Sequence, residues 1–142
     1  MTVDFGWAES FARDVRFGYI TDSVPSPRQH HPQVVLNAKG ASVLRTLREE
    51  LQRCDSFTFS VAFVSTRAIA LLKQELVEFE GDGRIITSDY LSFNSTEAFA
   101  ELLNLRQHGI DVRVHNASAF HPKGYIFEGQ DSLTVLVGSA NL

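Results

Sequence analysis

Residues 119–142 read AFHPKGYIFEGQDSLTVLVGSANL, and their pattern determines how this end of the chain can fold. Two apolar runs flank a turn-forming segment at residues 129–131, which predicts an antiparallel β-hairpin. Side chains two residues apart on a strand point to the same face of a sheet. The first strand of the hairpin would therefore present His121 and Lys123 together, with Pro122 directed the other way.

The same alternation assigns the rest of that strand to two faces. Tyr125 and Phe127 continue the face of His121, while Gly124 and Ile126 share the opposite face. The histidine is thus expected at the end of an aromatic stripe.

The second strand of the hairpin would return to the neighbourhood of His121. Residues 132–137 can pair back as the antiparallel partner, which carries Ser139 and Asn141 towards His121 and Lys123. An imidazole, an ammonium, a hydroxyl and a carboxamide would then converge beside a glycine that lets backbone approach closely. This set suits a phosphodiester, because it combines a nucleophile or proton carrier, a positive charge and donors for phosphoryl oxygens.

These residues resemble the motif of the phospholipase D superfamily, His-x-Lys-x4-Asp followed by Gly-Ser-x-Asn. His121, Lys123, Ser139 and Asn141 fall on its positions, and Glu128 stands where aspartate is usual. A larger part of the chain is similar to one branch, the phospholipase D-like domain at the N-terminus of bacterial DEAD/DEAH-type helicases. The stretches that carry this similarity are FGYITDSVPSPRQHHPQVVLN, CDSFTFSVAFVST, RIITSDYLSFN, FHPKGYIF and VGSANL.

The resemblance implies a mechanism in which two such motifs form one active site. One histidine attacks phosphorus and forms a phosphohistidine, and the other protonates the leaving oxygen, without a cofactor or a divalent metal. This chain has one copy of the motif, so a homodimer would supply the second across a two-fold axis. The resemblance also implies DNA as the phosphodiester substrate and a helicase domain in the same, longer chain. Family members commonly carry a carboxylate after Gly-Ser-x-Asn, and the sequence stops at Leu142, so we expect an N-terminal fragment truncated within its domain.

Three functions remain open at this stage. The first is a metal-independent phosphodiesterase that serves as a nuclease module of a DNA helicase or DNA-repair protein. The second is a catalytically inactive phosphate-binding, DNA-binding or dimerisation module attached to a helicase, which the net charge of −4 favours because nucleic-acid-binding domains are usually basic. The third is hydrolysis of phospholipid, which the sequence does not support because it has no basic amphipathic helix and no membrane segment. The choice between DNA and RNA, and any preference for sequence or structure, also remain open.

Composition indicates an ordinary globular domain. The chain has 142 residues, 44% of them hydrophobic and 21% charged, which fits a single domain over residues 1–142. No apolar run approaches the roughly 20 residues that span a bilayer, and no signal peptide precedes Asp4. The single cysteine, Cys54, excludes an internal disulfide. We therefore expect a cytoplasmic protein without a membrane partner.

Apolar periodicity predicts an α/β fold of the phospholipase D-like type, with a mostly parallel sheet flanked by helices and ended by the site-bearing hairpin. The expected helices cover residues 4–15 and 41–53, a segment capped by Ser65 or Thr66, and a segment that begins at Asn94 or Ser95 and is closed by Gly109. Besides the hairpin, the expected strands are residues 34–36, 57–63, 84–87 and 110–114.

Three other positions invite a functional interpretation. His30 and His31 are adjacent, would point apart on an extended segment and have no cysteine or acidic partner nearby, so we do not expect a metal site there. Asp89 and Tyr90 follow a strand, where ligand loops gather in parallel α/β sheets, so they either contact a ligand or close the loop. We expect Glu128 to be structural.

Overall fold

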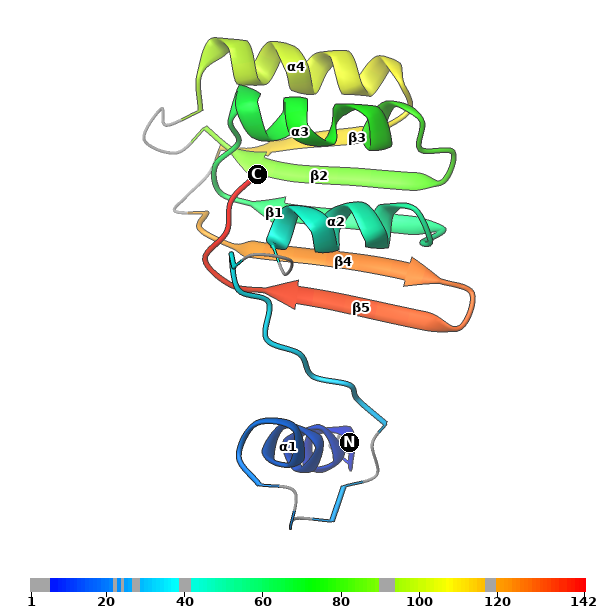
Figure 1. Ribbon diagram of the computed structural model, residues 1–142. Coiled ribbons are helices and arrows are strands. Elements are labelled where there is room, and N and C mark those ends of the chain that lie inside the picture. Colours follow the sequence, from blue (N-terminus) through cyan, green and yellow to red (C-terminus); the bar gives the residue numbers. More distant parts are fainter. Residues whose placement is uncertain are drawn as a thin grey trace, which may run out of the picture. The chain divides into compact units, whose positions relative to one another are not determined.

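The computed structural model describes residues 6–21, 23, 25–26, 29–38, 42–89, 94–116 and 120–142. They belong to two compact units, Met1–Leu36 and Asn37–Leu142. The first unit contains α1 (Gly6–Tyr19). The second contains, in chain order, α2 (Val43–Leu51), β1 (Ser56–Val61), α3 (Thr66–Val77), β2 (Asp82–Ser88), α4 (Thr96–Gln107), β3 (Asp111–His115), β4 (Lys123–Gly129) and β5 (Ser132–Val137) (Figure 1).

A buried carboxylate organises the first unit. Asp14 on α1 accepts hydrogen bonds from the backbone N–H of His30, at 2.6 Å, and from the hydroxyl of Ser26. The Phe11 ring packs edge-on against the His30 ring, with centroids 5.5 Å apart. A buried carboxylate is stable only when donors satisfy it, so these bonds tie the polar segment back onto the helix.

The prediction for the first unit is correct for its helix and wrong for its strand. The expected helix is present and extends to Tyr19, beyond its expected end at residue 15. Residues 34–36 form neither a helix nor a strand, and Val34 and Leu36 are exposed. A short apolar run becomes a strand only where a neighbouring strand pairs with it.

Caps define the helices of the second unit. Ser42, Ser65 and Ser95 each precede a helix, and each side-chain oxygen accepts a hydrogen bond from the backbone N–H three residues later. The structure therefore confirms Ser65 and Ser95 as caps, while α2 is shorter at both ends than the expected 41–53. Gly109 has a φ of 90° and follows α4, which confirms it as the residue that closes this helix.

The second unit is α/β, as predicted, but its sheet is mixed rather than mostly parallel. The strand order is β3-β2-β1-β4-β5. The pairs β1–β2 and β2–β3 are parallel, whereas β1–β4 and β4–β5 are antiparallel. Helices α3 and α4 form the crossovers that parallel pairing requires, while β4 returns beside β1 in the opposite direction.

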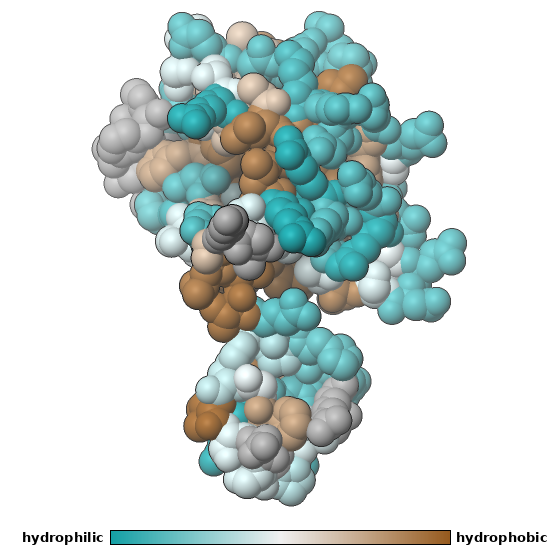
Figure 2. Space-filling model, viewed as in Figure 1, coloured by the Kyte–Doolittle hydropathy of each residue, from teal (hydrophilic) through white to brown (hydrophobic). Residues whose placement is uncertain are grey.

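Helices α2, α3 and α4 cover one face of this sheet (Figure 1). Both crossovers step in the same direction along the strand order, so right-handed connections place α3 and α4 on the same side. Apolar side chains also gather on the surface between α2 and α3, beside the C-terminal segment (Figure 2), where Leu44, Leu71 and Leu142 line a small groove. No helix of the described residues is long and apolar enough to cross a membrane.

The aromatic stripe of the hairpin packs against β1 beneath the helices. Tyr125 and Phe127 are 2% and 1% exposed, whereas Ile126 between them is 36% exposed, which confirms the predicted alternation. The Phe59 ring centroid lies 5.0 Å from that of Tyr125 and 5.6 Å from that of Phe127. Burial of each such side chain contributes about 1.5–3 kcal/mol, and a slip of one residue would expose them, so they determine the register of β4 against β1.

Candidate functional site

The histidine and the lysine of the motif meet at the start of β4. Lys123 is the first residue of β4, and its Nζ lies 2.8 Å from Nδ1 and 3.4 Å from Nε2 of His121. His121 is exposed and Lys123 is half-buried. A cation and an imidazole therefore lie side by side at the end of the sheet where β4 begins, as the two-residue spacing predicted.

Phe63 lies against both of these side chains. Its ring packs edge-on against the His121 ring, with centroids 5.5 Å apart and an interplanar angle of 82°. The Nζ atom of Lys123 lies 5.8 Å from the Phe63 ring centroid, within the range of a cation–π contact. Val61 pairs with Lys123, and the N–H of the next residue, Ala62, donates to the Pro122 carbonyl at 3.0 Å, so Phe63 follows opposite His121.

The C-terminal segment brings Asn141 to the same place. The Oδ1 atom of Asn141 accepts a hydrogen bond of 3.2 Å from the backbone N–H of Phe63. The next residue, Leu142, donates its N–H to the carbonyl of Phe63, at 3.2 Å, and accepts from the N–H of Ser65, at 2.7 Å. With Oδ1 engaged, the Asn141 amide has its two N–H donors for another acceptor, and no described residue takes them.

Ser139 lies in this segment but makes no hydrogen bond to the other three motif side chains among the described residues. It is exposed, and the N–H of the preceding Gly138 donates to the carbonyl of Lys123, at 3.3 Å. The structure therefore joins His121, Lys123 and Asn141 through Phe63 and brings the backbone of Ser139 beside them.

A buried amide holds the segment that carries Phe63. Asn94 is 8% exposed, and its Oδ1 accepts from the N–H of Val64, at 2.7 Å. Its Nδ2 donates to the carbonyls of Ser88, at 2.6 Å, and Ala62, at 3.4 Å, and to the Thr87 hydroxyl, at 3.2 Å. One side chain thus joins the ends of β1 and β2 just before α4.

Glu128 and Asp89 lie outside this cluster. Glu128 pairs with Ser56 at the far end of β4, five residues from Lys123, or about 17 Å along a strand. Asp89 is exposed, and its N–H donates to the carbonyl of His115, at 3.4 Å. Tyr90 lies outside the described residues, so its predicted role stays a prediction.

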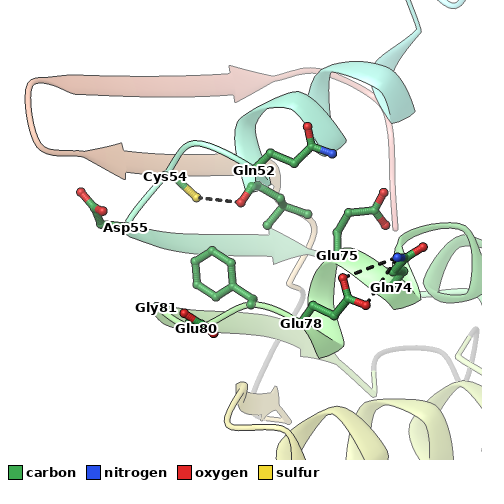
Figure 3. Close-up of a pocket in the computed structure, with 10 residues that line it drawn as sticks. Gln52, Cys54, Asp55, Gln74, Glu75, Glu78, Glu80 and Gly81 are labelled. Atoms are coloured by element: carbon green, nitrogen blue, oxygen red, sulfur yellow. Dashed lines mark hydrogen bonds between the residues drawn. The ribbon is translucent and has the colours of Figure 1, made fainter.

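A cavity of about 700 Å³ lies at the opposite end of the sheet (Figure 3). Cys54 and Asp55, from the turn before β1, line it together with Glu75 of α3, Glu78 just after this helix, and Glu80. None of the described residues that line it is lysine, arginine or histidine. The charged side chains that line this cavity are all carboxylates and would repel a phosphodiester, so the cluster around Phe63 suits a phosphate better.

Sequence reasoning missed the contributions of Phe63 and Asn94. The strand expected at residues 57–63 included Phe63, whereas β1 ends at Val61. The motif histidine and the apolar alternation of β1 would have identified Phe63 once the register was known. Asn94 was expected only as a possible helix start, and its four hydrogen bonds follow from the position of β2 relative to β1.

No model of a known protein family matches the chain, and no curated protein matches it either. Among the described residues, no group of three or more His, Cys, Asp or Glu side chains lies together where it could hold a metal ion.

Proposed function

We propose that this domain binds a phosphodiester at His121, Lys123 and Asn141 and cleaves it through a phosphohistidine, without a divalent metal. The observation that supports this most is that Lys123 Nζ lies 2.8 Å from Nδ1 of the exposed His121. A phosphoryl oxygen that enters between the two side chains would accept from the ammonium and leave a ring nitrogen free to attack. The N–H groups of Asn141 provide a second donor for phosphoryl oxygens.

The reaction needs a second proton carrier. A lone pair of the His121 imidazole forms a bond to phosphorus as the bond to the leaving oxygen breaks, and that oxygen takes a proton from a second histidine. Water then attacks the phosphohistidine, gives its proton to the second histidine, and the P–N bond breaks to restore His121. The cations and donors stabilise the charge on the phosphoryl oxygens in both steps.

A second copy of this chain is our proposed source of that histidine. A two-fold axis near the His121 edge would place two identical motifs face to face, because an isologous interface repeats the same surface on both partners. We further propose DNA as the substrate and a helicase or DNA-repair protein as the larger assembly, on the strength of the motif resemblance.

A second candidate function is a phosphate-binding module without catalysis. One observation favours it: among the described residues, the Ser139 hydroxyl makes no hydrogen bond to the other motif side chains. Such a module would still hold a phosphate at Lys123 but would form no covalent intermediate.

The two candidates are separated by incubating the protein with single-stranded and double-stranded DNA in EDTA. We expect cleavage by the wild type, its loss in His121→Ala, and no change in His108→Ala, a matched variant of an exposed histidine that follows α4. Denaturing mass spectrometry of trapped reactions should detect His121 joined through phosphorus to one of the DNA ends, since only one ester oxygen leaves in the first step. Cleavage that survives His121→Ala would refute the catalytic proposal, and DNA binding without cleavage or phosphohistidine would select the second candidate.

A further inference from the structure

We propose that Phe63 is the positioning residue of this site: its ring orients His121 and Lys123, and its backbone N–H orients Asn141. The kinetic part of this inference rests on the proposed phosphodiester function, whereas the structural part can be tested without any reaction. Phe63 lies outside the resemblance motif itself, two residues beyond the end of β1.

The Phe63 ring contacts both His121 and Lys123 and restricts how these two side chains can turn. His121 is exposed and precedes the first residue of β4, where a side chain has more room than inside the sheet. The edge-on contact with the Phe63 ring, at 5.5 Å and 82°, is an arrangement that the quadrupole of an aromatic ring favours. The same ring attracts the Lys123 ammonium at 5.8 Å, so both groups are oriented from one side.

The backbone of Phe63 restrains the third motif residue. Its N–H donates to Asn141 Oδ1, and its carbonyl accepts from Leu142 N–H, each at 3.2 Å. The first bond fixes which end of the amide is the acceptor, so the Asn141 N–H groups are presented as donors. Phe63 thus contacts all three side chains that would bind one phosphate: His121, Lys123 and Asn141.

Phe63 can act this way because its neighbours in the chain are held firmly. The N–H of Ala62 donates to the Pro122 carbonyl, at 3.0 Å, and the N–H of Val64 donates to Asn94 Oδ1, at 2.7 Å. The carbonyl of Ala62 accepts from three buried side chains: Thr87, Ser88 and Asn94, at 3.3, 3.2 and 3.4 Å. Buried and satisfied polar networks of this kind are rigid, which makes the segment a fixed support.

A variant that keeps an apolar side chain at position 63 but removes the ring should therefore leave His121 and Lys123 less well oriented and the fold intact. In Phe63→Leu we expect the His121 ring-proton NMR signals to shift, in part because the Phe63 ring current is lost, and their dependence on added inorganic phosphate to change because the imidazole is no longer oriented. We expect kcat for DNA cleavage to fall roughly 10- to 100-fold with KM changed less than about threefold, because misorientation lowers the rate more than binding. Phe63→Tyr keeps the ring and should restore both properties.

The control is Phe79→Leu, which removes another half-buried aromatic ring. Phe79 contacts Phe57 edge-on, at 4.9 Å, beside the acidic cavity at the opposite end of the sheet. The His121 signals are assigned by their loss in His121→Gln. Signals that stay in place in Phe63→Leu, or that move equally in Phe79→Leu, would overturn the positioning role. Absence of cleavage in every protein, with the Phe63→Leu shift present, would instead refute the proposed activity alone.

Discussion

Asn141 Oδ1 accepts a hydrogen bond from the backbone N–H of Phe63, 78 positions earlier in the chain. This bond closes the C-terminal segment onto the residues that follow β1. It also joins the end of the resemblance motif to its beginning, since the Phe63 ring contacts His121. Two substitutions of Asn141 can separate the structural part of this bond from its part in binding.

Asn141→Ala removes the acceptor and should lower the free energy of unfolding by about 1 kcal/mol, the usual net value of one hydrogen bond. Asn141→Asp keeps an acceptor for Phe63 and should retain most of that stability. Its negative charge would still repel a phosphate, so inorganic phosphate should bind more weakly than to the wild type. Urea unfolding and NMR titration measure the two effects, and equal stability losses in both variants would contradict this division.

Lys123→Met should weaken binding of inorganic phosphate at least about tenfold, because a phosphate contact through an ammonium is charge-assisted. The matched control is Lys73→Met, since Lys73 pairs with Glu101 at 2.9 Å between α3 and α4. Isothermal titration at low and high salt provides the measurement. Equal phosphate affinities of the two variants would show that Lys123 does not bind the phosphate.

Asn94→Leu should be the most damaging single amide substitution, with a loss of about 3 kcal/mol in the free energy of unfolding. It would leave the buried N–H of Val64 and the carbonyl of Ser88 without this partner, and each unsatisfied buried group costs about 1–3 kcal/mol. Asn104→Leu, on α4, is the control because no described residue hydrogen-bonds its side chain. Chemical denaturation compares the two, and similar midpoints would show that the Asn94 network contributes little.

Stability should fall at alkaline pH through Tyr125. Burial raises the pKa of Tyr125 from 10.0 to about 12, and its hydroxyl donates to the Ala140 carbonyl at 3.0 Å. The folded state thus favours the protonated phenol, so this contribution is complete below pH 10 and is lost as the pH rises from about 10 to about 12. The slope should be at most about 1.4 kcal/mol per pH unit. Urea midpoints at several pH values test this, and Tyr125→Phe should show a shallower decline than the wild type.

Cys54 should react slowly with thiol reagents in the folded protein. Burial is the main cause that raises the pKa of its thiol, so less of the reactive thiolate is present near pH 7.5 than for a free cysteine. Alkylation followed by mass spectrometry should therefore be slower in buffer than in concentrated urea. Equal rates in the two solutions would show that the cavity edge leaves this thiol open.

Local patterns were sufficient for much of this fold. Serine caps, the glycine that ends α4, and the alternation of Tyr125, Ile126 and Phe127 are set by neighbours along the chain, so they could be predicted from the sequence. The prediction of a strand at residues 34–36 was wrong because a strand needs a pairing partner, which the local sequence does not reveal.

By itself, the sequence indicated that His121 and Lys123 would lie side by side at the start of a hairpin strand, because side chains two residues apart on an extended segment point the same way. Only the tertiary structure decided that the sheet is mixed and that Phe63 and Asn141 meet at that histidine, while the Ser139 hydroxyl makes no hydrogen bond to the other motif side chains among the described residues. These relationships join residues far apart in the chain. They depend on the order and register of strands, which result from burial of the whole aromatic core rather than from any local pattern.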